Sequence, residues 1–283
     1  SINYLSEDSE VSVPKREVDS NKGSNGRVVV IGGSEKYLGA LMLAVRGATK
    51  TGAGYIIAFV LEKFNTALKV FAPDVVSIPV PSGERGYFSK EDADFILGSG
   101  IIRKDDVVVI GNGITTQEST RDFFEKLVMG LDNILVIDAD GINILSERPN
   151  FWGSLPNKDR IVLTPHVGEF ARLVKAEVSE VRGRAFLFGR EFSRTFGVNL
   201  VLKDNVNYVF FSDGEIWISD LNTPVLARAG TGDILAGLVG GNIAFTKSLK
   251  KGVTLGVKML GELARRWGED GFYPTPLEIL SGE

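Results

Sequence analysis

The sequence predicts an α/β fold with a mostly parallel central sheet and an antiparallel edge. Between residues 27 and 170, continuous apolar runs that suit strands buried on both faces alternate with segments of helical spacing. Between residues 199 and 219, short apolar runs are joined by Asn, Asp and Gly, which is typical of antiparallel strands and tight turns. We therefore expect one sheet with helices on both of its faces.

The first third of the chain shows the alternation most clearly. A buried strand over 27–33 ends in a glycine turn and leads into a helix over 38–54. The elements expected next are a strand over 55–60, a helix over 62–72, a strand over 75–80 and a helix over 91–99. The last of these begins with acidic residues, which are favourable at a helix N-terminus.

Later strands end in glycine or polar residues. These strands are expected over 107–113, 134–141 and within 160–170. Two long helices are expected near 230–245 and 248–267. The carboxyl ends of parallel strands share one edge of a sheet, which is where open α/β sheets bind ligands. Because the chain has no internal repeat or long linker, we expect an N-terminal arm over 1–20 and a single domain over 21–283.

Composition excludes several functional classes. The net charge of −4, from 32 basic and 36 acidic residues, provides no overall basic surface for nucleic acid. Cysteine is absent and histidine occurs once, which excludes disulfides, thiolate metal sites and sites with several histidines. No apolar run reaches the ~18 residues of a membrane span, and the polar N-terminus lacks a signal-peptide core. We expect a cytoplasmic protein that binds neither nucleic acid nor membranes.

The strongest functional signal is a glycine-rich turn that opens an apolar helix, Gly230-Thr231-Gly232-Asp233. Backbone N–H groups at a helix start are unpaired and partly positive, and glycine lets phosphate oxygens approach them closely. Asp233 falls in the first helical turn, where an acidic residue is also a common cap. The paired glycines favour phosphate binding over a simple cap. Further glycines at 237, 240 and 241 suit close packing onto a neighbouring element.

Polar residues also follow two of the expected strands. His166 comes after Pro165, which pushes the preceding residue toward extended backbone, so His166 projects from a strand tip. A lone histidine is more often structural or exposed than catalytic. Asp138 and Asp140 lie at the end of another strand, where they suit either a site near a metal or turn and helix-cap roles.

Five segments resemble, in the same order, the ADP/ATP-dependent NAD(P)H-hydrate dehydratase family of the ribokinase-like superfamily. The segments are residues 21–40, GNG at 111–113, DADGIN at 138–143, LTPHVGEF at 163–170 and AGTGD at 229–233. Together they extend the resemblance over almost the whole chain after residue 14. The resemblance implies a ribokinase-like three-layer sandwich. It also implies repair of hydrated NADH or NADPH, in which ATP or ADP phosphorylates the hydroxyl of the hydrate and phosphate is then eliminated.

The resemblance further implies a role for each candidate residue. Asp233 would take the hydroxyl proton, and the N–H groups of Gly230, Thr231 and Gly232 would stabilise the migrating phosphoryl group. Glu169 and Asp138 would lie near Mg²⁺, although an acid at a helix start needs no such role. The substrate contacts would be Gly39, Ala40, Gly113, His166 and Asp233. The adenine nucleotide would be held by Lys203, Asp204, Asn205, Val206, Asn207 and Gly232.

Several residues depart from the family pattern. Asp204 stands where glycine usually follows the lysine, and Asn207 where the family has threonine. Ala229 replaces the first glycine of the phosphate turn, and Asn112 replaces a frequent proline. The changes at 204 and 207 bear on nucleotide affinity and on the choice between ATP and ADP.

Two other functions remain open from the sequence. A ribokinase-like vitamin or small-alcohol kinase would share Asp233 and the glycine turn, and a non-catalytic nucleotide-binding protein would fit the altered segment 203–207. For a dehydratase, the expected partners are NAD(P)H hydrate, an adenine nucleotide and an NAD(P)H-hydrate epimerase, as a domain or a separate protein. We also expect a homo-oligomer.

Overall fold

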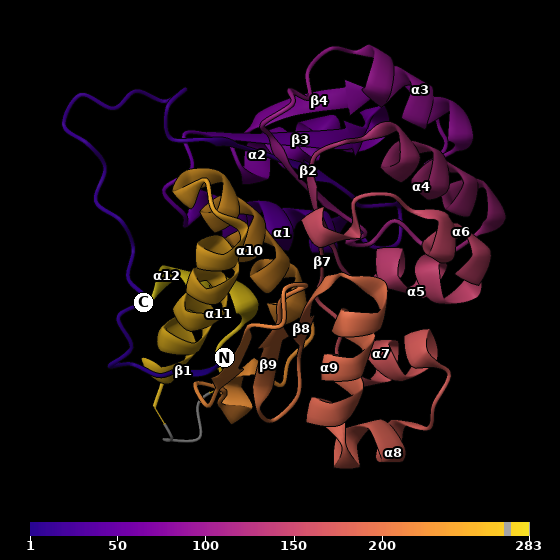
Figure 1. Cartoon of the computed structure of the whole chain (residues 1–283). Helices are drawn as coiled ribbons and strands as arrows, with labels where there is room; N and C mark the ends of the chain where they lie inside the picture. The colour runs from indigo at the N-terminus through magenta and orange to yellow at the C-terminus, as the bar shows by residue number, and fades with distance from the viewer. Residues whose placement is uncertain (269–272, 283) are drawn as a thin grey trace.

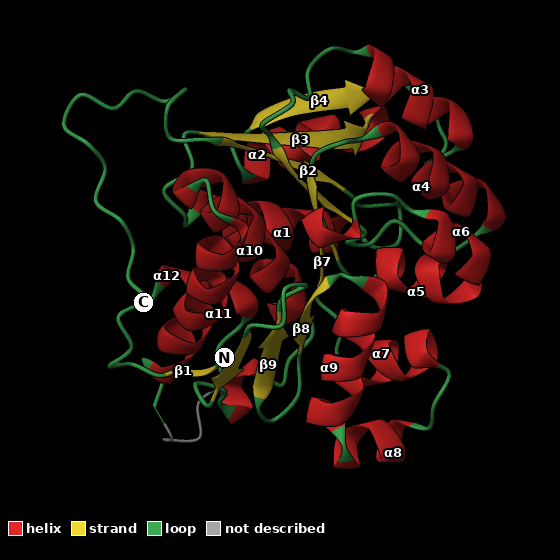
Figure 2. Cartoon of the chain, in the orientation of Figure 1, coloured by secondary structure: helices red, strands yellow, loops and turns green. Residues whose placement is uncertain are grey.

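A single ten-stranded sheet runs through the computed structural model, which describes residues 1–268 and 273–282 (Figure 1). The strand order is β1-β10-β9-β8-β7-β6-β5-β2-β3-β4. Helices cover both faces of the sheet, as Figure 2 shows, and two separate apolar cores lie between the helices and the strands. The predicted three-layer α/β sandwich is therefore confirmed.

Parallel pairing dominates the sheet. The strands paired in this way are β2 (Arg27–Ile31), β3 (Tyr55–Leu61), β4 (Val76–Val80), β5 (Val107–Ile110), β6 (Ile134–Ile137), β7 (Ile161–Leu163) and β8 (Asn199–Leu202). Their apolar runs are continuous because both faces are covered. In β2, Val29 and Ile31 enter one core, and Val28 and Val30 enter the other.

The predicted antiparallel edge is also present. Strand β9 (Asn207–Phe210) runs antiparallel to both of its neighbours, β8 and β10 (Ile216–Ser219). Strand β1 (Ile2–Leu5) then pairs in parallel with β10 at the border of the sheet. The first residues of the arm are thus part of the sheet, whereas residues 6–26 contain no helix or strand.

The helices divide between the two faces. One face carries α1 (Leu38–Thr49), α2 (Asn65–Phe71), α10 (Thr231–Thr246), α11 (Leu249–Arg265) and α12 (Pro276–Ser281). The other carries α3 (Lys90–Gly98), α4 (Glu118–Gly130), α5 (Asp140–Glu147), α6 (Pro149–Ser154), α7 (Val167–Val174), α8 (Val178–Gly183) and α9 (Ala185–Phe196).

Helix α10 packs unusually close to its neighbours through glycine. A Cβ on Gly237 would lie 1.9 Å from the carbonyl oxygen of Ala44 on α1, and one on Gly240 would lie 2.3 Å from Cγ2 of Val109 on β5. On α1, a Cβ on Gly47 would lie 2.3 Å from the carbonyl oxygen of Ile234. The close packing expected of these helix glycines is confirmed, and it fixes where α10 begins relative to the sheet.

The chain order of the strands reverses between β2 and β5. After β2 the chain adds β3 and β4 on one side, and then returns to place β5 on the other side of β2. The segments that follow β2 and β5 meet at this point, where the Gly33 amide donates to the carbonyl oxygen of Asn112 at 2.8 Å. Such a reversal is the usual ligand-binding position of open α/β sheets. No helix within the described residues is long and apolar enough to span a membrane.

Candidate active site

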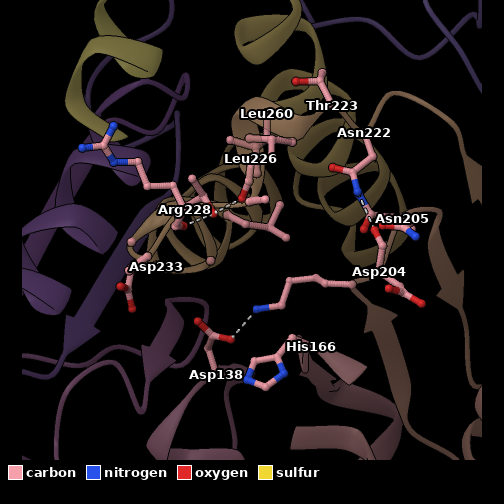
Figure 3. A pocket seen from close by; sticks show the side chains of 18 of the residues that line it. Asp138, His166, Asp204, Asn205, Asn222, Thr223, Leu226, Arg228, Asp233 and Leu260 are labelled. Atoms are coloured by element: carbon pink, nitrogen blue, oxygen red, sulfur yellow. Dashed lines mark hydrogen bonds and ion pairs between the residues drawn. The ribbon is translucent and has the colours of Figure 1, made fainter. Parts of the chain in front are cut away.

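Polar side chains that follow four adjacent strands lie close together at the carboxyl edge of the sheet. Asp138, Thr164 and Lys203 come directly after β6, β7 and β8, and Asn112 is the second residue after β5. Asp233 approaches from the first turn of α10. Figure 3 shows Asp138 and Asp233 facing one cavity from these different elements. The sheet edge predicted to hold the site is therefore where the polar residues meet.

The Asp138 carboxylate is fully engaged by its neighbours. Its Oδ1 accepts hydrogen bonds from Thr164 Oγ1 at 2.8 Å and from Lys203 Nζ at 3.1 Å. Its Oδ2 accepts from Asn112 Nδ2 at 2.9 Å. Asp138 is buried, so these three donors provide the pairing that a buried carboxylate requires. Asp138 is consequently suited to orienting its neighbours rather than to binding a metal directly.

Asp233 is the carboxylate poised for proton transfer. Burial, together with the negative charge of Asp138, raises its pKa to about 7, against the opposing effect of the hydrogen bond from Asn112. Asn112 Nδ2 donates to Asp233 Oδ1 at 2.7 Å. Within the described residues, Oδ2 of Asp233 takes part in no hydrogen bond. A carboxyl group whose pKa lies near neutrality, with one oxygen unengaged, is suited to general base catalysis.

The glycine turn forms an anion cradle beside Asp233. Gly230 precedes α10 with a φ of 98°, a left-handed conformation that favours glycine. The Thr231 hydroxyl donates to the carbonyl oxygens of Leu226 and Arg228, both at 2.9 Å, which fixes the turn. A Cβ on Gly232 would lie 3.0 Å from Lys203 Nζ. The Thr231 amide donates to the Arg228 carbonyl at 3.3 Å, whereas the amides of Gly230 and Gly232 donate no hydrogen bond within the described residues. Two unpaired N–H groups and one ammonium group are therefore available for phosphate binding.

Lys203 supplies the positive charge of the site. Burial acts to lower its pKa, but the charges of Asp138 and Glu169 outweigh that effect and raise it. The sequence predicted Lys203 as a phosphate contact, and the structure adds its ion pair with Asp138.

His166 and Glu169 begin helix α7. His166 Nδ1 accepts from the amides of Gly168 at 3.0 Å and Glu169 at 3.3 Å, and Glu169 Oε2 accepts from the His166 amide at 2.9 Å. This reciprocal arrangement is a capping box. Because Nδ1 accepts, the pattern assigns the proton of the neutral imidazole to Nε2. Burial, with the charge of Lys203, lowers the pKa of His166 and so favours this neutral form.

A cavity of about 810 Å³ adjoins these groups. Most of the predicted site residues line it, together with residues that sequence reasoning missed, notably Asn222, Thr223 and Arg228. The predicted residues on its wall are Asp138, His166, Glu169, Lys203, Asp204, Asn205, Asn207, Gly230, Thr231, Gly232 and Asp233. The segment 203–207 thus faces the cradle, as expected of a nucleotide contact, but Val206 is not among the lining residues.

Three predicted substrate contacts form a separate group. Gly39, Ala40 and Gly113 do not line the cavity. Gly113 has a φ of 69°, and a Cβ there would lie 2.9 Å from Cβ of Ala40. Gly39 is exposed, with open space where a Cβ would stand. Asn112, next to Gly113 in the chain, connects this group to Asp233 through its hydrogen bond to Oδ1.

Backbone strain marks the turn that carries Asp138. Ala139 adopts φ 49° and ψ −120°, a backbone conformation that residues other than glycine rarely adopt. The Gly141 amide donates to the Asp138 carbonyl oxygen at 3.0 Å and closes the turn. Such residues cost about 1–3 kcal/mol and are frequent at functional sites. Asp140, the next residue, accepts from the Thr115 amide at 2.9 Å.

Comparison with known families gives one assignment over nearly the whole chain. A family model described as NAD(P)H-hydrate dehydratase matches residues 28–281. Two curated relatives, each named bifunctional NAD(P)H-hydrate repair enzyme Nnr, come from Dictyoglomus turgidum and Methanopyrus kandleri. The first is 31% identical over 246 residues and the second 33% over 250, each over 87% of this chain and 46% of the relative. The chain therefore spans about half the length of the curated relatives it matches.

Solved structures share the fold. A ribokinase-like superfamily protein from Enterococcus faecalis superposes with a TM-score of 0.85 at 24% identity, over 99% of this chain and 93% of that one. An ADP/ATP-dependent NAD(P)H-hydrate dehydratase from Bacillus subtilis, co-crystallised with ATP/Mg²⁺, gives 0.80 at 23% identity, over 95% and 91%. The ribokinase-like fold implied by the sequence is confirmed.

Proposed function

Because the chain belongs to the NAD(P)H-hydrate dehydratase family, we propose that it dehydrates hydrated NADH or NADPH with ADP or ATP as phosphoryl donor. The observation that carries the proposal is the placement of Asp233, whose pKa of about 7 and unengaged oxygen lie at the phosphate-binding start of α10. The 810 Å³ cavity beside it has space for a nucleotide.

The residues of the site divide the reaction between them. Asp233 Oδ2 would accept the proton of the hydrate hydroxyl as the hydroxyl oxygen attacks the terminal phosphorus of the nucleotide, which releases ADP from ATP or AMP from ADP. The unpaired N–H groups of Gly230 and Gly232 would stabilise the negative charge on the transferred phosphoryl group, and the Lys203 ammonium group would partly neutralise that charge. Electrons from the ring nitrogen then expel the phosphorylated oxygen as phosphate, which leaves the ring as an iminium ion. Loss of a proton from the neighbouring ring carbon then restores the reduced nicotinamide.

The donor set suits Mg²⁺ held indirectly. Among residues 1–268 and 273–282, no group of three or more His, Asp or Glu side chains is arranged to hold a metal ion. The oxygens of Asp138 are occupied by protein donors, whereas Glu169 Oε1 is 3.5 Å from His166 Nε2 and accepts no backbone bond. Mg²⁺ usually keeps several waters and binds substrate phosphates. We propose that Glu169, and more distantly Asp138, orient water on an ion bound to the phosphates, where it would neutralise phosphate charge.

The direct test is recovery of the reduced coenzyme. We expect incubation with hydrated NADH, Mg²⁺ and either ATP or ADP to restore NADH absorbance while releasing one inorganic phosphate per NADH. A vitamin or small-alcohol kinase would instead leave a stable phosphate ester on its own acceptor. If a folded protein that binds nucleotide restores no absorbance with either donor, the dehydratase proposal fails.

A pair of variants separates the two roles of His166. We expect His166→Asn to keep the cap of α7, because asparagine is a good N-cap, and His166→Ala to lose about 1 kcal/mol of stability. Both remove the Nε2 donor on the cavity wall, so both should raise KM for hydrated NADH more than KM for ATP or ADP. Kinetics and thermal unfolding measure the two effects. Wild-type KM values in His166→Asn would reduce His166 to a helix cap.

The surroundings of this activity are also part of the proposal. The relatives are named bifunctional, and this chain matches about half of each. We propose that an NAD(P)H-hydrate epimerase, as a domain or a separate protein, works together with this chain, as the resemblance implies. The homo-oligomeric state, the cytoplasmic location and the domain limits 21–283 stay predictions.

A further inference from the structure

Within the described residues, Asn112 is the one side chain that is hydrogen-bonded to both Asp138 and Asp233. Its amide nitrogen donates to Asp138 Oδ2 at 2.9 Å and to Asp233 Oδ1 at 2.7 Å. An NH₂ group has two hydrogens, so each carboxylate receives one of them. Asn112 is fully buried. The relative position of the two acids is therefore set by one residue.

The backbone around Asn112 is held from three sides. Gly111 has a φ of 118°, and a Cβ there would lie 2.1 Å from the carbonyl oxygen of Asp138. A Cβ on Gly113 would lie 2.4 Å from the carbonyl oxygen of Tyr37. The Asn112 carbonyl itself receives the Gly33 amide. With the segments after β2 and β6 packed against it, residue 112 has little freedom to move.

The other end of the same amide is unsatisfied. Asn112 Oδ1 is buried and has no hydrogen-bond partner among the described residues. A buried unpaired acceptor costs about 1–3 kcal/mol. Turning the amide over would bring this oxygen against the two carboxylates, which would repel it. The unpaired Oδ1 of Asn112 therefore destabilises the fold, while the amide nitrogen holds Asp138 and Asp233 in place. This combination indicates a role in function rather than in folding.

We propose that Asn112 is the positioning residue of the site. Its amide nitrogen holds the Asp233 carboxylate by Oδ1, so that Oδ2 faces the reacting hydroxyl at a fixed distance from the phosphate cradle. Asn112 touches neither reactant and acts through Asp233. This inference rests on the proposed function for the identity of that hydroxyl, but the bridge itself can be tested without any substrate.

The bridge also affects proton binding by Asp233. The charged groups that face Asp233 are Asp138 after β6, Lys203 after β8 and Glu169 on α7. The Asn112 hydrogen bond favours the ionised carboxylate and so lowers the pKa that burial raises. Without that donor, Asp233 would bind its proton more tightly and hold its carboxylate in no fixed direction.

The test compares two buried asparagines at opposite ends of the neighbouring strands β5 and β6. Asn112→Leu removes the bridge and keeps the branched shape of the side chain. Asn133→Leu removes another buried amide, just before β6, whose Nδ2 donates to the carbonyl oxygens of Arg103 at 2.7 Å and Asp106 at 2.9 Å. The first readout is the titration of the Asp233 carboxyl followed by ¹³C NMR, assigned with Asp233→Asn. The second is kcat and KM across pH.

We expect Asn112→Leu to raise the pKa of Asp233 by about one unit. We also expect it to lower kcat about tenfold or more at pH values where Asp233 is ionised, with KM for the nucleotide unchanged. Asn133→Leu should reduce stability and change neither the titration nor kcat. If Asn112→Leu does not fold, Asn112→Ser, which is too short to reach both acids, should show the same shift.

An unchanged Asp233 titration in a folded Asn112 variant would overturn the inference, as would an equal shift in Asn133→Leu. Failure of the proposed function looks different. In that case the wild-type protein restores no NADH, yet the NMR comparison of the two asparagines still decides whether Asn112 holds Asp233.

Discussion

Replacing Asp233 by asparagine is expected to reduce kcat by roughly a hundredfold or more, the usual contribution of a general base. The amide has the size of the carboxylate and its oxygen can still accept from Asn112, so the cavity should keep its shape. ATP or ADP affinity should therefore survive. Turnover with hydrated NADH and nucleotide binding by calorimetry measure the two properties, and near wild-type turnover would remove Asp233 from the mechanism.

The pH dependence of the wild-type protein follows from the same residue. A base must be ionised in the free enzyme, so kcat/KM should rise with pH around a midpoint near 7. The contribution of Asp233 to the free energy of unfolding changes with pH in the opposite direction. A carboxyl whose folded pKa lies above its unfolded value of about 3.9 stabilises the fold when protonated, so this contribution declines as pH rises from about 4 to about 7.

Asp233→Asn should consequently be more stable than wild type above pH 7, because it removes a buried charge. A matched control is Asp106→Asn at the amino end of the sheet, where Asp106 is buried and Arg27 Nε lies 2.8 Å from its Oδ1. That change should lower stability and leave kcat unchanged. Equal loss of turnover in both variants would indicate general disruption of the fold.

Replacing Lys203 by methionine is expected to be the most destabilising change in the site. The ammonium group is mostly buried, with 18% of the side chain exposed, and it pairs with a carboxylate that is 2% exposed. Removing one partner of a buried pair costs about 3–5 kcal/mol, because the remaining charge stays buried and unpaired. Here Asp138, Asp233 and Glu169 would lose the ammonium group whose charge acts on all three, so turnover should also fall.

The pH profile identifies the cause of that loss. Because the folded pKa of Lys203 is raised, its stabilising contribution is complete below the unfolded value of about 10.4 and is lost only as pH rises through the folded pKa. Across the acid and neutral range the cost of Lys203→Met therefore depends on Asp233 and Glu169, whose pKa values are raised by burial, and it should shrink toward pH 4 as these two carboxyl groups bind protons.

Urea unfolding at pH 4.5 and pH 8 tests this, with Lys250→Met as the control. Lys250 also pairs with two acids, Asp213 and Glu215, but 41% of its side chain is exposed. Exposed pairs contribute about 0–1 kcal/mol. A loss in Lys203→Met no larger than in the control, or one independent of pH, would contradict the proposed charge balance.

The sequence predicted the parts of this site that depend on local pattern. Apolar runs located the strands, and the polar residue after each run marked the sheet edge where Asp138 and Lys203 meet. The glycine turn located the helix start that carries Asp233. These features depend on periodicity and on the backbone conformations that glycine allows, which neighbouring residues determine.

What the sequence did not predict depends on several elements at once. Asn112 stood out only as a departure from a frequent proline, since its role requires α10 and the turn after β6 to lie on either side of it. Strand β1 was missed because its pairing with β10 joins residues more than 200 positions apart. Glu169 was weighed between a metal role and a helix-start role; its bond to the His166 amide shows that it caps α7, and its role near Mg²⁺ stays a proposal.

The packing of α10 determines which part of the molecule can move during a reaction. This helix is buried along almost its whole length, with α1 and α11 against it and glycine in place of side chains at its closest contacts. It cannot tilt or slide without opening the core. The backbone of Asp233 is therefore held in place, and closure around bound reactants is expected from the loops that border the cavity.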